Sequence, residues 1–159
     1  MTRSEARDSI FRIIFREAFF PAEGMEEQTE EYLNALGEEP EVFLPGMQKE
    51  IEESDLEYIR TKVDAILART DELDAMLESA SKDWKMSRVG KAELAILRVA
   101  AYEICFDDDI PGKVAINEAM ELTKKYCDEK AGPFVNGVLN QLLVRQDEQE
   151  QKAASEESV

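Results

Sequence analysis

Few side chains in this sequence are of the types that carry out nucleophilic or metal chemistry. The chain has two cysteines, Cys105 and Cys127, and no histidine. A catalytic cysteine is usually activated by a histidine, and a structural metal site needs about four ligands. Each cysteine lies within an apolar helical pattern. We therefore expect two buried free thiols rather than a disulfide framework or a metal centre.

Carboxylates are abundant, but their spacing carries no information about catalysis. Glu118 and Glu121 have the spacing of paired acid and base groups on one helix face, yet a chain with 36 acidic residues produces many such pairs. No glycine-rich phosphate loop occurs either. The sequence therefore predicts a protein that is not an enzyme and that uses no cofactor.

Arginines are concentrated near the N-terminus of an otherwise acidic chain. The formal net charge is −17, yet the first helical stretch contains Arg3, Arg7, Arg12 and Arg16. A globally acidic protein repels nucleic acid at long range, so any RNA affinity must be local and salt-sensitive. Taken alone, the arginines are better explained as a solvated helix surface, and the acidity as an aid to solubility.

Amphipathic helices must position these side chains. The stretch 107–143 contains two of them, with Pro111 near the start of the first and Gly132 and Pro133 before the second. The preceding stretch, 89–106, has too many apolar residues for one stripe, which predicts a central helix packed on several sides. Further helices are expected at about residues 4–20, 26–36, 55–67 and 71–84.

The first of these helices has a recognisable start and a recognisable apolar side. Thr2 and Glu5 have the spacing of a capping box, in which each side chain accepts from the other residue's backbone N–H. Phe11, Phe15 and Phe19 recur at helical spacing, so all three are expected on the apolar face of the helix.

The pattern as a whole predicts an all-α fold. No alternation typical of a strand persists between turn signals, so we expect a compact bundle of about seven helices, in one domain or two small subdomains. The tail after about residue 146 is rich in Gln, Glu, Lys and Ser and is expected to be disordered. No apolar run reaches the ~20 residues that span a bilayer, and no signal sequence is evident, which predicts a cytoplasmic protein that does not enter membranes.

Three motifs, taken in order, resemble the NusB family of bacterial transcription antitermination factors. They read ILRVAAYEI at 96–104, IPGKVAINEAMELTKK at 110–125 and FVNGVL at 134–139. Trp84, four residues before Arg88, adds to the match. The resemblance covers nearly the whole chain and is strongest from Trp84 onward.

The resemblance implies a single NusB-like helical domain over residues 1–146, with halves at about 1–84 and 85–146 and an acidic tail at 147–159. It also implies partners, namely the boxA element of ribosomal RNA leader transcripts and NusE, a ribosomal small-subunit protein. With other Nus factors, that complex joins the RNA polymerase elongation complex and suppresses premature termination. Some family members form homodimers that cover the RNA surface, and the sequence leaves this state open.

Site residues follow from the same resemblance. Arg3 and Arg7 match the arginine-rich RNA-binding arm, and guanidinium groups suit contacts with phosphates and bases. Phe15 and Phe134 match positions beside the RNA, although core packing would explain either residue as well. Glu93 matches an acidic position that faces NusE, where a carboxylate suits a basic partner.

Two features of this sequence depart from the family pattern. Ser4 and Glu5 interrupt the arginines of the arm, which lowers the number of counterions released and predicts weaker RNA binding. Before Phe134, many members have an acidic residue followed by serine, whereas this chain has Lys130 and three uncharged residues. We expect Lys130 to contact phosphate and partly offset the thinner arm.

Polar residues inside the motifs are expected to be mainly structural. Arg98, Asn117 and Asn136 would satisfy buried polar groups of the helix bundle. Gly137 lies within a predicted helix, where glycine costs about 1 kcal/mol relative to alanine. Close approach of a neighbouring helix would explain it.

Two alternatives to an antitermination factor remain open. A related helical domain is an accessory module of RNA cytosine methyltransferases, but this chain has no region for a cofactor-binding sheet. The other alternative is an acidic helical adaptor that binds proteins and no RNA.

Overall fold

The structure is a computed structural model that describes residues 1–47, 49–81 and 88–157. It confirms the predicted all-α fold, and the described ranges contain no strand. Trp84, one of the residues that carried the family resemblance, lies outside the described residues. The helices are α1 (Arg3–Arg16), the 3-10 turn η1 (Ala22–Gly24), α2 (Met25–Glu38), α3 (Pro40–Phe43), α4 (Glu53–Ala68), α5 (Thr70–Ala80), α6 (Lys91–Phe106), α7 (Gly112–Tyr126) and α8 (Ala131–Glu157).

The described ranges thus hold eight α-helices, one more than the sequence predicts. The additional helix is α3, a single turn in the connection between α2 and α4. Pro40 stands at its first position, where the missing N–H costs nothing.

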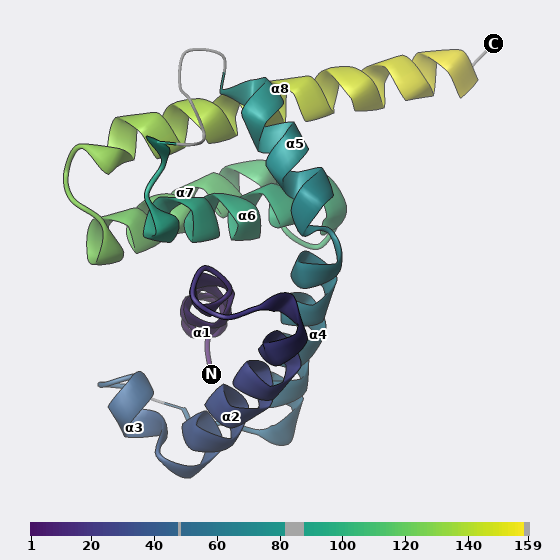
Figure 1. The fold of residues 1–159 in the computed structure, drawn as a ribbon. Coiled ribbons are helices and arrows are strands. Elements are labelled where there is room, and N and C mark those ends of the chain that lie inside the picture. The colour runs from purple at the N-terminus through teal and green to yellow at the C-terminus, as the bar shows by residue number, and fades with distance from the viewer. Residues whose placement is uncertain (48, 82–87, 158–159) are drawn as a thin grey trace. The chain divides into compact units, whose positions relative to one another are not determined.

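The chain divides into two compact units, Met1–Arg69 and Thr70–Val159. In the first unit, α1, α2 and α4 pack against one another in pairs (Figure 1). Its core is built from large apolar side chains that are fully buried: Ile10, Phe11, Ile14, Leu33, Leu36, Ile59 and Ile66.

In the second unit, α6 packs against α5, α7 and α8. This confirms the prediction of a central helix, because α6 buries Ile96 and Leu97 together with Ala100 and Ala101. Side chains that face it from the other helices are also fully buried, among them Leu73, Leu77, Val135 and Leu139.

The boundary between the units falls before α5, whereas the sequence analysis placed it near residue 84. Leu73 and Leu77 of α5 are fully buried, and α5 packs on α6 and α8. The helix therefore belongs to the core of the second unit. Helical periodicity shows that a helix has an apolar face but not which neighbour covers that face.

The predicted capping box at the start of α1 is confirmed. The Glu5 backbone N–H donates to Thr2 Oγ1 at 3.1 Å, and the Thr2 backbone N–H donates to Glu5 Oε1 at 2.7 Å. Two of the unpaired donors of the first helical turn are thereby satisfied. Arg3 follows the cap directly, so its backbone position is fixed by these bonds.

The far end of α1 differs from the prediction. The helix ends at Arg16, and Phe19 is 58% exposed instead of facing the core. Phe20 is exposed as well. The helical period assigns a residue to a face only while the helix continues, and the chain leaves it before Phe19.

Three motif residues of the second unit, Gly137, Asn117 and Asn136, have surroundings that differ from those predicted. The close approach of two helices occurs at Gly112 of α7, where a Cβ atom would collide with the Leu143 side chain of α8. Gly137 instead faces open space, with no atom within 4 Å of a Cβ placed there. Asn117 and Asn136 are exposed and do not satisfy buried groups as expected.

The structural interpretation of Arg98 agrees with the geometry. Arg98 of α6 binds Asp74 of α5 through two parallel bonds, Nε to Oδ1 at 2.8 Å and a terminal nitrogen to Oδ2 at 2.7 Å. The guanidinium is largely buried, with 13% of the side chain exposed. A two-point bond of this kind is stronger and more directional than a single surface ion pair.

Residues 147–157, which were expected to be disordered, continue α8 and are exposed (Figure 1). No glycine or proline follows Gly137 in this helix, and Gln, Glu, Lys and Ala are good helix formers. None of the helices in the described part of the chain is long and apolar enough to span a membrane.

Replacing Asp74 with alanine should destabilise the second unit by about 1–2 kcal/mol, because the largely buried Arg98 guanidinium loses a charge-assisted, two-point partner. Urea denaturation followed by circular dichroism measures the effect. Glu78→Ala, at an exposed carboxylate of the same helix, is the matched control and should change the stability by less than about 0.5 kcal/mol. Equal effects of the two substitutions would contradict the role assigned to the pair.

Candidate nucleic-acid interface

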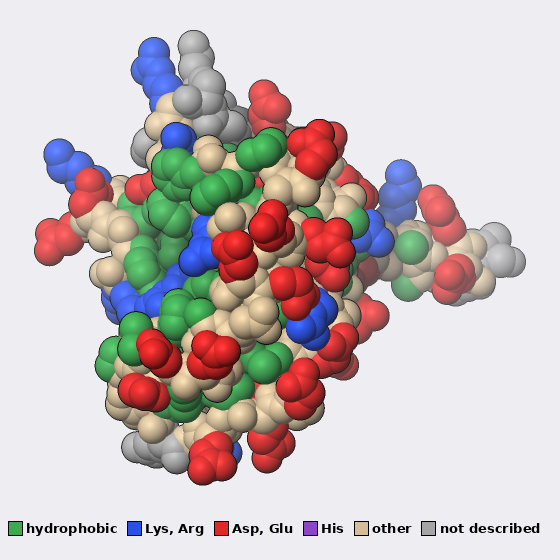
Figure 2. Space-filling view, turned by 60° about the horizontal axis from the view of Figure 1, so that its bottom comes forward, with side chains coloured by type: hydrophobic (Ala, Val, Ile, Leu, Met, Phe, Trp, Pro, Cys, Tyr) green, Lys and Arg blue, Asp and Glu red, His purple; other side chains and the backbone are tan. Residues whose placement is uncertain are grey.

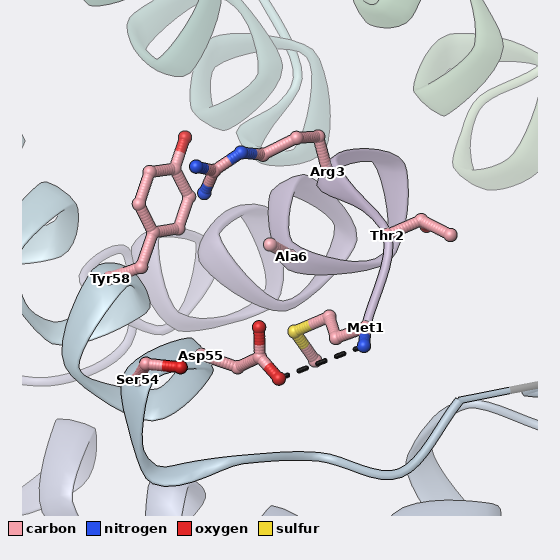
Figure 3. Close-up of a pocket in the computed structure, with 7 residues that line it drawn as sticks. All are labelled: Met1, Thr2, Arg3, Ala6, Ser54, Asp55 and Tyr58. Carbon is pink, nitrogen blue, oxygen red and sulfur yellow. Dashed lines mark ion pairs between the residues drawn. The ribbon is translucent and has the colours of Figure 1, made fainter.

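Arg3 lies at the first position of α1 and is exposed. Its guanidinium carbon lies 3.8 Å from the centre of the Tyr58 ring, so the cation stacks on the aromatic face (Figure 3). Tyr58 belongs to α4 and comes to Arg3 through the packing of α1 on α4. Tyr58 is not predicted from the sequence, because no local pattern signals a contact between positions so far apart.

Lys62, one helical turn after Tyr58, fixes the ring from its other end. Its ammonium group donates to the Tyr58 hydroxyl at 3.2 Å and lies 5.5 Å from the ring centre. The Lys62 residue is only 6% exposed. Tyr58 therefore lies between two cations, one stacked on its face and one bonded to its hydroxyl.

A pocket of about 410 Å³ opens beside this stack. In the view of Figure 3, Arg3 and Tyr58 lie on one side of Ala6, and Met1 and Asp55 lie on the other. The Met1 ammonium group forms an ion pair with Asp55 Oδ2 at 3.6 Å. The residues lining the pocket are Met1, Thr2, Arg3, Ala6, Ser54, Asp55 and Tyr58. The pocket thus combines a stacking cation, hydroxyl groups and a carboxylate.

Arg7, the second arginine predicted to bind RNA, has a different environment from Arg3. It is only 5% exposed, and its side chain has interaction partners within the protein. The difference follows from helical geometry, since Arg3 lies in the first turn beside the capped end and Arg7 lies one turn further in. In this structure Arg3 is the more accessible of the two.

Phe15 is half-buried within a row of aromatic rings along α1. Its ring centre lies 5.9 Å from that of Phe11 in a stacked arrangement and 5.3 Å from that of Phe19 in an edge-to-face arrangement. Phe11 is buried and Phe19 exposed, so the row runs from the core of the first unit to its surface. Phe15 therefore packs within this row and keeps a partly accessible ring, and its contact with RNA stays a prediction.

The two RNA-binding residues predicted in the second unit lie at or just after the turn between α7 and α8. Lys130 is exposed, and its backbone N–H donates to Asp128 Oδ1 at 3.0 Å. This bond shapes the turn and leaves the ammonium group at the surface. Phe134, in the first turn of α8, is 8% exposed and packs inward. A stacked base would need more of the ring than the structure presents.

Acidic side chains are about twice as numerous as basic ones in this chain, with 36 Asp and Glu against 19 Lys and Arg. Figure 2 shows Asp and Glu side chains scattered over the face that it draws, with fewer Lys and Arg side chains. In the first unit, Arg60 bonds Glu30 at 2.7 Å, which lowers the pKa of that carboxyl group. Nearby, burial and then the charges of Glu26 and Glu30 raise the pKa of Asp64. This side of α2 and α4 is anionic and would repel phosphate.

Glu93, predicted to face the protein partner, is half-buried at the start of α6. Its carboxylate lies against Gly90, so that a Cβ atom at Gly90 would collide with it. Its carboxylate also helps to raise the pKa of the Cys127 thiol at the end of α7. Glu93 thus links the start of α6 to the end of α7, and its contact with a partner stays a prediction.

Both cysteines are free thiols, as expected, but they are half-buried rather than buried. Burial, followed by the charges of Glu72 and Glu150, raises the pKa of Cys105 to about 11. Burial and then Glu93 raise the pKa of Cys127 to about 11. Thiols of this kind are poor nucleophiles at neutral pH, because the thiolate is the reactive form. No cluster of metal-binding side chains occurs in the described ranges.

Comparison with known proteins gives matches along most of the chain. Residues 4–144 match the NusB family. The transcription antitermination protein NusB of Lachnoclostridium phytofermentans is 41% identical over 143 residues, which cover 90% of this chain and 99% of that protein. The protein of the same name from Agathobacter rectalis is 43% identical over 87% of this chain and 97% of its own length.

Solved structures agree with the sequence matches. NusB of T. maritima superposes with a TM-score of 0.74 at 26% identity, over 90% of this chain and 91% of that one. A second similar chain comes from a complex of the antitermination factors NusB and NusE with double-stranded RNA. It has a TM-score of 0.66 at 27% identity and covers 90% of this chain and 96% of its own.

Alkylation of the two thiols by iodoacetamide should be slow at pH 7.5 and should still rise steeply, close to tenfold per pH unit, up to about pH 9.5. The reason is that a thiol with a pKa of about 11 has little thiolate in this range. Mass spectrometry of each cysteine-containing peptide measures the rates, and the urea-unfolded chain is the control. A rate that levels off near pH 8.5, as for an ordinary cysteine, would contradict the raised pKa values.

Proposed function

The chain belongs to the NusB family, and we therefore propose that it is a transcription antitermination factor that binds RNA together with NusE. The observation that carries this proposal is the match to antitermination proteins over nearly the full length of both chains. The RNA is of the boxA type found in ribosomal RNA leader transcripts. The complex acts in the cytoplasm on the RNA polymerase elongation complex with other Nus factors.

Electrostatics limits how the chain can hold RNA. With a net charge of −17, the protein repels phosphate except where cations are fixed at the surface. Arg3 and Lys130 are the exposed cations of the predicted site, and Phe15 offers a partly accessible ring. Few phosphate contacts mean that base stacking contributes a large share of the affinity.

Buried members of the predicted site have a supporting role in this proposal. Arg7 and Phe134 are almost inaccessible, at 5% and 8% exposure. Arg7 lies in α1 one turn after Arg3, and Phe134 lies in the first turn of α8, just after Lys130. In this proposal Arg7 and Phe134 stabilise these helix ends, and the exposed residues beside them contact the RNA.

NusE compensates for the acidity of the chain. A basic ribosomal protein bound to an acidic surface lowers the net negative charge near the RNA and adds cations of its own. Glu93 is the residue proposed to face it. Cooperative binding of RNA and NusE follows, because each partner lowers the electrostatic cost of binding the other.

A boxA-type RNA oligonucleotide should bind this chain weakly alone and at least about tenfold more tightly with NusE present. Without NusE, the slope of log K against log salt should be shallow, roughly −1 to −2, since a single strand contributes about −0.7 per phosphate contact. Fluorescence anisotropy at 50–200 mM salt measures both quantities.

A scrambled RNA of the same length is the control for this titration. No binding of boxA-type RNA with or without NusE would exclude the proposal and favour the acidic adaptor that binds only proteins. Equal binding of the scrambled sequence would show that the chain lacks boxA recognition.

Lys130→Glu should weaken RNA binding about fivefold to tenfold and make the salt slope shallower by about 1, because a phosphate contact becomes a repulsion. Lys152→Glu, in the exposed C-terminal part of α8, makes the same change in net charge and is the matched control. An affinity unchanged by Lys130→Glu, or lowered equally by both substitutions, would remove Lys130 from the RNA site.

A further inference from the structure

Of the residues that line the pocket beside Arg3 and Tyr58, only Arg3 belongs to the predicted site, and the chemistry of the whole pocket suits RNA. We propose, on the basis of the function above, that this pocket receives one unstacked nucleotide of the bound RNA. Tyr58 is the positioning residue: it holds the Arg3 guanidinium flat so that the base can stack against it.

The stack of Arg3 on Tyr58 leaves a surface on which a base can bind. The guanidinium carbon of Arg3 lies over the Tyr58 ring, 3.8 Å from its centre, so the ring occupies one side of the guanidinium. A guanidinium plane can stack on aromatic rings while its N–H edge still donates to phosphate. The remaining face of Arg3 is therefore a platform for a base, and its edge can reach the backbone of the same nucleotide.

The Arg3 side chain is held in place before any RNA binds. A free arginine side chain at a helix end has many rotamers, and fixing one of them on binding lowers the affinity. Tyr58 fixes Arg3 before the RNA arrives, and Lys62 in turn fixes Tyr58 through the bond to its hydroxyl at 3.2 Å. At the backbone, the Thr2–Glu5 capping box holds the start of the helix that carries Arg3. Three contacts thus place one exposed guanidinium.

The size of the pocket and its polar lining suit a nucleotide. A volume of about 410 Å³ suits a single nucleotide, within the usual range for small-molecule pockets. One Asp55 oxygen pairs with the Met1 ammonium group, and the other points toward Ala6 in Figure 3. A carboxylate oxygen in this position can accept from an N–H group of an unpaired base, since each of the four RNA bases has at least one. The Ser54 hydroxyl adds a second polar group at the same wall.

Site-directed variants test the role of Tyr58 in binding boxA-type RNA with NusE present. Tyr58→Leu removes the aromatic face and should weaken binding about fivefold or more, whereas Tyr58→Phe keeps the face, loses the bond to Lys62 and should weaken binding only about twofold to threefold. Arg3→Lys keeps the charge without the planar group and should lose about as much as Tyr58→Leu. Combining Arg3→Lys with Tyr58→Leu should add little further loss, because both remove the same stack.

A scan of the RNA separates a nucleotide site from a general effect on the fold. Each nucleotide is replaced in turn by an abasic one, and the affinity of every RNA is measured for the unmodified protein and for Tyr58→Leu. One position should be sensitive in the unmodified protein and insensitive in the variant. Tyr102→Leu, at a half-buried tyrosine of α6, is the control and should leave the profile unchanged.

The outcomes distinguish this inference from the proposed function. Suppose that the unmodified protein binds RNA. If Tyr58→Leu and Arg3→Lys then bind it equally well, or if all variants give the same abasic profile, the nucleotide pocket is overturned and the proposed function is not. No RNA binding by the unmodified protein would overturn both. Thermal melting checks the fold of each variant, and Arg3→Lys, an exposed substitution, decides the matter if Tyr58→Leu does not fold.

Discussion

Burial of α6 is the interaction on which the second unit depends. The helix has apolar residues around most of its circumference, and α5, α7 and α8 each cover part of it. Because these three helices pack their apolar sides on α6, their polar sides and the turn between α7 and α8 face the solvent. Lys130 is exposed for this reason, and Phe134, one turn later, is drawn inward. The requirement to cover one apolar helix thus decides which motif residues remain accessible.

Local sequence patterns were sufficient for much of the fold and for part of the candidate site. The Thr2–Glu5 capping box and the central position of α6 both follow from short-range chemistry, and both are confirmed. Phe19 was misplaced because the period of a helix says nothing once the helix ends. Tyr58 was missed because its contact with Arg3 depends on how α1 packs against α4, which is a property of the tertiary structure.

Charge and packing act together in the first unit. The Arg60 ion pairs and the raised pKa of Asp64 describe a side of α2 and α4 where negative charge accumulates. At the start of α1, by contrast, Arg3 and Lys62 surround a single aromatic ring. An acidic protein can approach RNA if such small cationic regions are rigid, since rigidity replaces the long-range attraction that a basic protein would use.

Gly137 has a practical consequence for engineering this protein. The glycine lies in the second turn of α8, is exposed, and leaves space where a side chain would project. Alanine or cysteine at this position would meet no steric obstacle, and alanine would favour the helix by about 1 kcal/mol. The position is therefore suited to a covalently attached fluorophore or spin label that reports on the surface of the second unit without disturbing its core.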